Sequence, residues 1–319
     1  MTLLEDAPPK PLPLPRTPET LGGELRRMLA SGTLDLPLPG GGELRRRWSA
    51  LAGFGRRDLA LGRLAEGHAD ATAILAEAGL AAEPQALYGV WASKSSGTGS
   101  SLHNGRLSGT TRFCSGLTLL DRALVVAGDQ LVEVDLTARG VQRHPDAWQS
   151  VGMDASDSGD AVFDDVPVLR EVGPPGWYVA RRGFVRGGAG VAAVWLGGAA
   201  GVVDSVCESL RTKADEHQLA HLGALHAALR GSEELLTATA GTIERAADPG
   251  LENDTCRASV ERTARDVVDL APRITGPGLL CRDRRFAQQV ADLQVFIRQH
   301  HGERDLAALG RAVLAEGRA

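Results

Sequence analysis

The sequence predicts a mainly α-helical protein with a small β-domain in its middle and a four-helix bundle after it. Residues 87–168 contain the only long series of short apolar or alternating segments bounded by Gly, Asn, Asp and Ser. Such segments are typical of antiparallel strands and their turns. On both sides of them, apolar residues recur at helical spacing. The 319 residues are enough for two or three domains with a sizeable core.

The chain begins with two predicted regions, a Pro-rich arm over residues 1–16 and a shortened helical domain over 17–84. Thr17-Pro18-Glu19-Thr20 is typical of a helix start, with proline and an acid in the first turn. The apolar spacing predicts helices over 18–30, 43–52 and 57–78. In the third helix, Glu66 and His68 are either ordinary polar positions or part of a helix that lines a ligand pocket.

The predicted β-domain covers residues 85–172, and the predicted C-terminal bundle covers 173–319. Glycine and proline breaks divide the bundle into helices near 183–213, 218–246, 253–272, 283–299 and 304–316. The first of these is dense in Gly and Ala between residues 187 and 201. Small residues at this density allow a neighbouring backbone, or a flat ligand, to approach closely.

Composition narrows the range of partners. A net charge of -5 and a pI near 5.9 give no electrostatic reason to expect nucleic acid or an anionic membrane. No uninterrupted apolar run approaches the roughly 18–20 residues of a membrane span, and the N-terminus lacks the pattern of a signal peptide. The four cysteines are far apart and form no CxxC pair, which argues against a disulfide framework or a zinc site. We therefore expect a cytoplasmic protein without a metal centre.

Four strings of the sequence, taken in order, match one pattern. Residues 107–116 are similar to a strand ending written G-x-K-x-W-I-T-N/S-G, and residues 158–168 to a strand written F-D/E-D-V-x-V-P. Arg211 and His221 have the spacing of R-x-x-F-G-x-x-x-x-x-H-Q, and 276–278 stands where a G-G-x-G turn is usual. These strings, and the order of helices, β-domain and bundle, resemble the acyl-CoA dehydrogenase superfamily over most of the chain. The resemblance implies a divergent member with a short N-terminal domain.

The resemblance implies an FAD site at the end of the β-domain strand. Ser115 would present a hydroxyl to the N5/O4 edge of the flavin, with Phe113 as its flat neighbour and Cys114 between them. Trp91 and Ser93 occupy the place of the family's T-E-x-x-x-G-S-D loop, which holds flavin and substrate, although the loop is shortened and its acid is missing. From the residues alone, Phe113 is equally a strand core residue and Ser115 a turn former.

The resemblance also implies contacts at the far end of the cofactor. Arg211 would contact the FAD pyrophosphate of a neighbouring subunit, because a guanidinium suits a pair of phosphates. Gly276 and Gly278 would belong to the cofactor-binding turn. The chain departs from the pattern here, since Ala214 replaces an aromatic residue and Leu222 replaces a glutamine. The alternative for Arg211 is an ordinary solvated arginine on a helix.

The catalytic base is the main departure from the family. Dehydrogenation of an acyl thioester needs a carboxylate to take the α-proton while a hydride passes to flavin N5. The family places a glutamate in a Y-E-G-T turn or on the first bundle helix, but here the turn is 299–303, Gln-His-His-Gly-Glu. His301, His300 and Glu303 are therefore the candidate bases, since imidazole titrates near neutral pH. The simpler interpretation makes Glu303 a helix N-terminal acid and the histidines partners of helix-end carbonyls.

Three functions remain open. The first is an FAD-dependent oxidoreductase that acts on an acyl thioester, such as a CoA thioester, or on a related small molecule by hydride transfer. The second is a flavin-dependent monooxygenase of the same fold. The third is a non-catalytic subunit or ligand-binding protein that has lost the base. We expect a homodimer or homotetramer, or a complex with a partner subunit that completes the short N-terminal domain.

Overall fold

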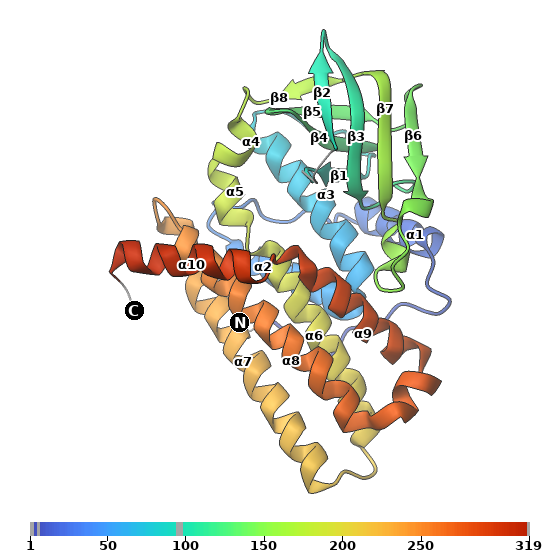
Figure 1. Ribbon diagram of the computed structural model, residues 1–319, viewed down its shortest axis with the longest axis vertical. Coiled ribbons are helices and arrows are strands. Elements are labelled where there is room, and N and C mark those ends of the chain that lie inside the picture. Colours follow the sequence, from blue (N-terminus) through green and yellow to red (C-terminus); the bar gives the residue numbers. More distant parts are fainter. Residues whose placement is uncertain (1–2, 5–6, 94–97, 318–319) are drawn as a thin grey trace.

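The structure is a computed structural model that describes residues 3–4, 7–93 and 98–317. In Figure 1 the β-domain lies at one end of the molecule, the long helices of the bundle lie at the other, and α3 runs between them. The order of elements is helices, then strands, then helices. The predicted fold class is therefore confirmed.

Three helices precede the strands: α1 (Pro18–Ala30), α2 (Leu44–Arg57) and α3 (Leu59–Glu77). The start of α1 is as predicted, because Thr17 and Thr20 form a reciprocal capping box beside Pro18. Only Asp58 separates α2 from α3. Its carboxylate caps α3 by accepting a hydrogen bond from the Leu61 N–H (2.9 Å).

Before α1, the Pro-rich arm packs onto the protein. The side chains of Leu3 and Leu12 are buried in the main core. Arg16 forms ion pairs with Asp58 (3.2 Å), Asp154 (3.0 Å) and Asp292 (2.6 Å). The arm thus connects the start of α3 to Asp154 and Asp292, which lie 138 and 276 residues after Arg16 in the chain.

The β-domain is a single sheet with the strand order β6-β7-β3-β2-β4-β5-β8, and β1 pairs with β4. Most pairs are antiparallel, but β1 and β2 each pair with β4 in parallel. The strands that carry apolar runs, such as β5, are buried along nearly their whole length. The strands are β1 (Tyr88–Trp91), β2 (Gly99–His103), β3 (Arg106–Cys114), β4 (Arg122–Ala127), β5 (Gln130–Asp135), β6 (Val141–His144), β7 (Gly159–Pro167) and β8 (Arg170–Val172).

Helices α6 to α9 form the bundle, which α4, α5 and α10 extend. The prediction ended the third bundle helix near 275–278, but α8 continues to Arg282 with a kink at Gly276, where φ is 63° and ψ is -170°. The Gly-Pro pair interrupts the helix without ending it, because a proline is tolerated in the first turn of the segment that follows. The helices are α4 (Trp177–Ala180), α5 (Arg182–Gly187), α6 (Gly190–Leu210), α7 (Glu216–Arg245), α8 (Gly250–Arg282), α9 (Arg284–Phe296) and α10 (Glu303–Glu316).

The Gly- and Ala-rich helix α6 is the central helix of the core. A Cβ on Gly197 would lie 1.9 Å from the Ala52 carbonyl oxygen, and one on Gly55 would lie 2.3 Å from the Val194 carbonyl oxygen. The small residues therefore allow the backbones of α2 and α6 to touch. Of the two interpretations of this glycine density, a neighbouring backbone accounts for these positions.

Hydropathy identifies one candidate membrane span among the described residues, the helical stretch Arg182–Leu210. Charged and small residues interrupt the apolar residues of this stretch. However, 83% of its apolar window is buried inside the protein. Burial on all sides is what a central core helix requires.

Candidate functional site

The end of β3 has an irregular geometry that displays one aromatic ring. The register with β7 shifts between Thr111 and Cys114, and Phe113 between them has a positive φ of 59°. This bulge turns the Phe113 side chain outward, where 59% of the residue is exposed, while Cys114 is fully buried. Burial raises the pKa of the Cys114 thiol, whose Sγ donates to the Thr111 carbonyl (3.2 Å). Cys114 is therefore an inert core residue, and Phe113 is available to a ligand.

Ser115 is fixed from two directions directly after the bulge. The Trp91 indole Nε1 donates to the Ser115 carbonyl oxygen (3.1 Å), so a hydrogen bond joins β1 to the end of β3. The Ser158 hydroxyl donates to the Ser115 Oγ (3.1 Å), which leaves the hydroxyl proton of Ser115 free for another acceptor. Ser93 lies two residues after Trp91 and is half-buried. A flat exposed ring beside a preoriented hydroxyl suits the edge of a flavin ring.

The turn before α10 separates its three candidate bases. His300 is buried, with 5% of its surface exposed, and its Nδ1 has no hydrogen-bond partner among the described residues. His301 is exposed, and both its backbone N–H (3.0 Å) and its ring Nδ1 (3.2 Å) contact the Asp305 carboxylate. Glu303 is exposed in the first turn of α10. Of the three, His300 is the one that lies inside the protein.

The protonation of this turn follows from its surroundings. Burial lowers the pKa of His300, and the nearby Arg257 and His301 lower it further, while Asp305 and Glu261 oppose them. His300 is therefore neutral at pH 7 and able to accept a proton. Burial acts to raise the pKa of Asp305, but the hydrogen bonds from His301 outweigh burial and lower it.

Helix α3 carries a buried carboxyl that the sequence did not single out as a base. Glu66 is 8% exposed and accepts a hydrogen bond from Arg63 Nη1 (2.6 Å). Burial raises its pKa to about 7, with Arg63 opposing the rise and Asp70 adding to it. A buried carboxyl that titrates near neutral pH is typical of functional sites. The signal in the sequence was the spacing of Arg63, Glu66 and Asp70, which places all three on one helix face.

His68, two residues further, has a structural role. Its Nδ1 accepts a hydrogen bond from the Tyr88 backbone N–H (3.2 Å), which ties α3 to β1. Burial lowers its pKa to about 4. The two polar residues of this helix therefore differ. Glu66 has the raised pKa that is typical of functional sites, whereas His68 is a hydrogen-bonded core residue.

The C-terminal end of α6 lies at the end of the bundle remote from the β-domain (Figure 1). Arg211 ends α6, is exposed, and pairs with Glu208 of the same helix (2.7 Å). Gly276 forms the kink of α8, and Gly278 follows it on the surface. Within this single chain, Arg211 contacts no residue of the β3 end in the described structure.

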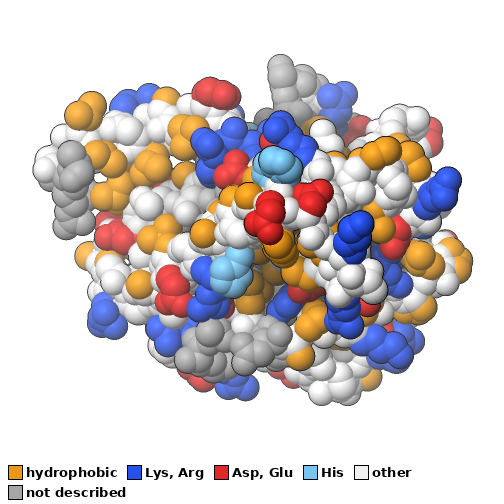
Figure 2. All heavy atoms as spheres, turned by 90° about the horizontal axis from the view of Figure 1, so that it is seen from below, with side chains coloured by type: hydrophobic (Ala, Val, Ile, Leu, Met, Phe, Trp, Pro, Cys, Tyr) orange, Lys and Arg blue, Asp and Glu red, His pale blue; other side chains and the backbone are white. Residues whose placement is uncertain are grey.

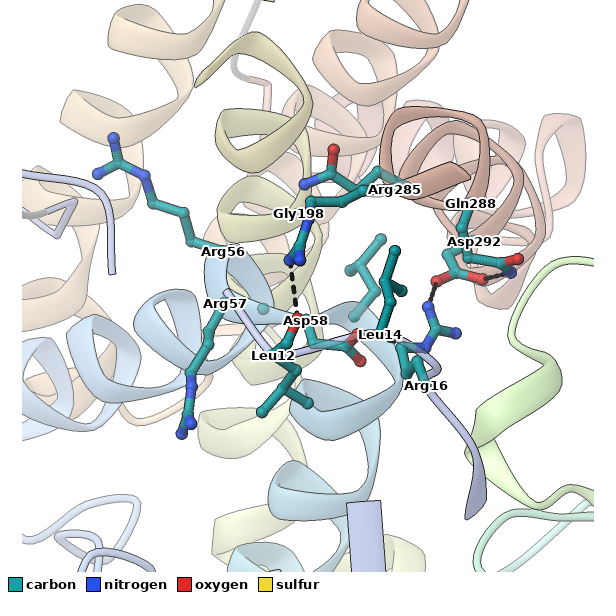
Figure 3. A pocket seen from close by; sticks show the side chains of 13 residues that line it. Leu12, Leu14, Arg16, Arg56, Arg57, Asp58, Gly198, Arg285, Gln288 and Asp292 are labelled. Carbon is teal, nitrogen blue, oxygen red and sulfur yellow. Dashed lines mark hydrogen bonds and ion pairs between the residues drawn. The ribbon is translucent and has the colours of Figure 1, made fainter. Parts of the chain in front are cut away.

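A cavity lies beside the Pro-rich arm, between the α2–α3 junction and α9 (Figure 3). A neighbouring hollow of about 410 Å³ shares Leu14, Arg16 and Gln288 with it. Arg16, 8% of whose side chain is exposed, points toward Asp292 across this space. Because Arg16 pairs with three aspartates, it holds the arm against the α2–α3 junction and α9. Lining residues drawn in Figure 3 include Leu12, Leu14, Arg16, Arg57, Asp58, Gly198, Arg285, Gln288 and Asp292.

Metal-binding clusters, cysteines and surface charge complete the description of possible sites. In the part of the chain that the structure describes, no three His, Cys, Asp or Glu side chains are placed to hold a metal ion. All four cysteines are free thiols. On the face shown in Figure 2, basic and acidic side chains are interspersed and form no broad patch of one sign.

Comparison with known proteins agrees with this geometry. Residues 175–297 match the family model described as "Acyl-CoA dehydrogenase, C-terminal domain". The dibenzothiophene monooxygenase TdsC from Paenibacillus sp. A11-2 superimposes with a TM-score of 0.77 over 94% of this chain and 91% of that chain, at 20% sequence identity. The chain has the acyl-CoA dehydrogenase fold. Its sequence matches no curated protein.

Other solved structures of this superfamily fold show how diverse the similar proteins are. A nitrososynthase from Micromonospora carbonacea var. africana has a TM-score of 0.75 at 15% identity, over 93% of this chain and 92% of its own. An electron transferring flavoprotein of Acidaminococcus fermentans has a TM-score of 0.80 at 14% identity, over 94% and 90% of the two chains. TdsC has been crystallised with FMN and indole. At these identities the likeness establishes the fold of this chain, and its activity is a separate question.

Proposed function

We propose that this protein is a divergent member of the acyl-CoA dehydrogenase superfamily, and that it is a flavin-dependent monooxygenase that acts on a small organic molecule and uses FMN. The observation that supports this most is the turn before α10, where His301 stands at the position of a dehydrogenase's glutamate and the preceding His300 is buried. Glu303, the nearest acid in the turn, is exposed in the first turn of α10. The structurally similar TdsC is a monooxygenase with FMN bound. Both facts favour oxygenation over removal of an α-proton from an acyl thioester.

The residues at the end of β3 fit a flavin ring. A bound flavin supplies two-electron redox chemistry that no side chain of this protein can perform. Ser115 would hold the edge of the ring with its free hydroxyl proton, and Phe113 would cover a flat face. Trp91 fixes the Ser115 carbonyl and so keeps the hydroxyl in one orientation. Ser93 would complete the site from the segment after β1.

His300 would move the proton that the reaction requires. It is neutral at pH 7 because burial lowers its pKa, and its Nδ1 is without a partner among the described residues. A neutral imidazole of this kind can take a proton from an acidic N–H, O–H or S–H group of a substrate. His301 would act on His300 through the turn, since Asp305 holds its ring and backbone.

Dehydrogenation remains the second candidate, because Glu66 offers a carboxyl that the family pattern does not predict. Its pKa of about 7 would allow it to act as a base at neutral pH. In that reaction Glu66 would take the α-proton of a substrate such as a CoA thioester, with FAD or FMN as the acceptor. Glu66→Gln would then abolish the reduction of bound flavin by an acyl-CoA.

We also propose that the protein is a cytoplasmic homo-oligomer whose subunit contact includes Arg211. The exposed position of this guanidinium at the end of α6 would allow it to reach the cofactor of a neighbouring subunit. Size-exclusion chromatography with light scattering gives the oligomeric state, and Arg211→Ala should weaken flavin retention if the contact exists. A monomer whose Arg211→Ala variant retains flavin fully contradicts this proposal.

The first test is the visible absorption of the purified protein after incubation with FMN or FAD and desalting. We expect FMN to be retained, with Ser115→Ala losing most of it and the exposed Ser101→Ala behaving as wild type. The reduced flavin should then react with oxygen and transfer an oxygen atom to a substrate, for which indole is a first probe. Reduction of the flavin by acyl-CoA would indicate dehydrogenation instead. A protein that retains neither flavin would refute both enzyme proposals and favour a non-catalytic binding role.

A further inference from the structure

Arg257 on α8 is a half-buried cation without a carboxylate partner among the described residues. Its Nη1 donates to the Gly188 carbonyl (2.9 Å) and its Nη2 to the Gln299 carbonyl (3.4 Å). The guanidinium also lies over the ring of Trp195, 5.3 Å from the ring centroid. Two carbonyls leave part of the five N–H groups of the guanidinium unused. Elsewhere, Arg47 and Arg16 pair directly with aspartates when buried.

The acids that face this region are already engaged with other groups. Asp305 is held by His301 (3.2 Å) and Glu66 by Arg63 (2.6 Å). Asp254 accepts from the Asn253 Nδ2 (3.1 Å), and Glu261 pairs with Arg265 (2.9 Å). The positive charge of Arg257 is therefore not neutralised by a direct ion pair with any described side chain.

Three buried polar atoms around Arg257 lack hydrogen-bond partners among the described residues. They are the His300 Nδ1, the Asn253 Oδ1 and the Trp195 Nε1. Each such atom costs about 1–3 kcal/mol when nothing satisfies it, so a group of three calls for an explanation.

These atoms belong to one place in the fold. Asn253 is one helical turn from Arg257 on α8, and a Cβ on Gly188 would lie 2.9 Å from its Oδ1. His300 directly follows Gln299, whose carbonyl binds Arg257. The site is therefore formed where α5 meets α6, next to the turn before α10.

We propose that Arg257, with Asn253 and His300, binds an oxyanion of the substrate, so that the substrate is a small organic acid carrying a carboxylate or phosphate. The proposal rests on the proposed function, because His300 is its proton acceptor. The planar guanidinium fork matches two oxygens of a carboxylate or phosphate. The Asn253 Oδ1 accepts a hydrogen bond from a second substrate group beside the anion, and His300 accepts the proton that the substrate gives up in the reaction. The site thus orients the substrate by its charge.

The test is calorimetric titration of the purified protein with benzoate, with its neutral analogue benzamide and with inorganic phosphate. We expect at least one of the two anions to bind about 10-fold to 100-fold more tightly than benzamide, as a hydrogen bond to a charged group implies. Arg257→Met, which keeps the aliphatic volume, should abolish this preference, and Arg257→Lys should retain part of it. Arg262→Met is the matched control, because Arg262 is an exposed arginine of the same helix paired with Asp266 (3.3 Å).

Near-ultraviolet circular dichroism shows whether Arg257→Met folds. If it does not fold, a second variant tests the same proposal. Asn253→Asp has the same shape but adds a negative charge, and should weaken anion binding about 10-fold or more. Equal binding of benzoate, phosphate and benzamide, or no saturable binding of either anion at millimolar concentration, overturns the proposal. So does an Arg257→Met variant that binds the anion as wild type does.

Flavin retention, measured separately by absorption, distinguishes the two proposals. Anion binding without flavin refutes the proposed function and leaves the anion site standing. If phosphate alone binds and FMN displaces it, the guanidinium serves the cofactor phosphate, which overturns the assignment to substrate.

Discussion

The contact between α2 and α6 predicts that Gly197→Ala destabilises the protein strongly. A Cβ at this position would lie 1.9 Å from the Ala52 carbonyl oxygen, about 1 Å closer than the 3.0 Å that real Cβ atoms reach. The obstacle is backbone, so no side chain can rotate away, and the two helices must separate. Inserting a methyl group into such a contact costs about 1–3 kcal/mol and occasionally more. We expect the upper end of this range, because the obstacle is backbone. Since Gly→Ala within a helix otherwise gains about 1 kcal/mol, the expected net loss is about 2 kcal/mol.

Equilibrium urea unfolding, followed by far-ultraviolet circular dichroism, measures this loss as a lower midpoint. Gly223→Ala is the matched control, because Gly223 is exposed inside α7 and its Cβ would meet nothing within 4 Å. That control should be stabilised by about 1 kcal/mol. If Gly197→Ala unfolds at the wild-type midpoint or above it, the backbones of α2 and α6 are not in contact and our account of this glycine-rich helix is wrong.

Three further predictions concern buried charges, each measured by urea unfolding across a pH series. Folding raises the pKa of Glu66 from 4.5 to about 7, so the folded state binds more protons than the unfolded state in this pH window, and stability falls as pH rises. Glu66→Gln should remove this fall in stability, of roughly 2–3 kcal/mol. An unchanged pH slope would contradict this prediction. Folding lowers the pKa of His68 from 6.5 to about 4, so the contribution of the neutral imidazole to stability is present above pH 6.5 and is lost as pH falls toward 4. His68→Gln should reduce this loss of stability at acid pH. A steeper loss in the variant would refute the structural role of His68. Arg16→Met should lower the free energy of unfolding by about 3–5 kcal/mol at pH 7, because it leaves the buried Asp292 without its cation. Burial raises the pKa of Asp292 to about 6, so protonation below pH 6 should reduce this deficit, and a deficit independent of pH would exclude the mechanism.

The helices and the order of domains were predictable because local signals specify them. The capping box at Thr17 and Thr20 starts α1 where the sequence indicated. Glycine-proline signals were less reliable, since Gly276 only kinks α8. A proline removes a hydrogen-bond donor that the first turn of a new helical segment does not need, so the helix could resume.

The candidate site was predictable only in part. The family resemblance assigned Trp91 and Ser115 to one flavin site, and a hydrogen bond joins these two residues. The sequence did not indicate that Phe113 is displayed by a bulge, because the register of β3 against β7 depends on both strands. It also gave no reason to prefer Arg257, since an isolated arginine on a helix is usually solvated.

By itself, the sequence determined the fold class, the place of the β-domain and the absence of a glutamate directly before Gly302. These depend on local periodicity and on residue identity at one position. Only the tertiary structure decided that Glu66 and His300 are buried and that Arg257 is half-buried. Burial and the pairing of charges depend on residues far apart in the chain, and these distant contacts convert an ordinary carboxyl, imidazole and guanidinium into a candidate site.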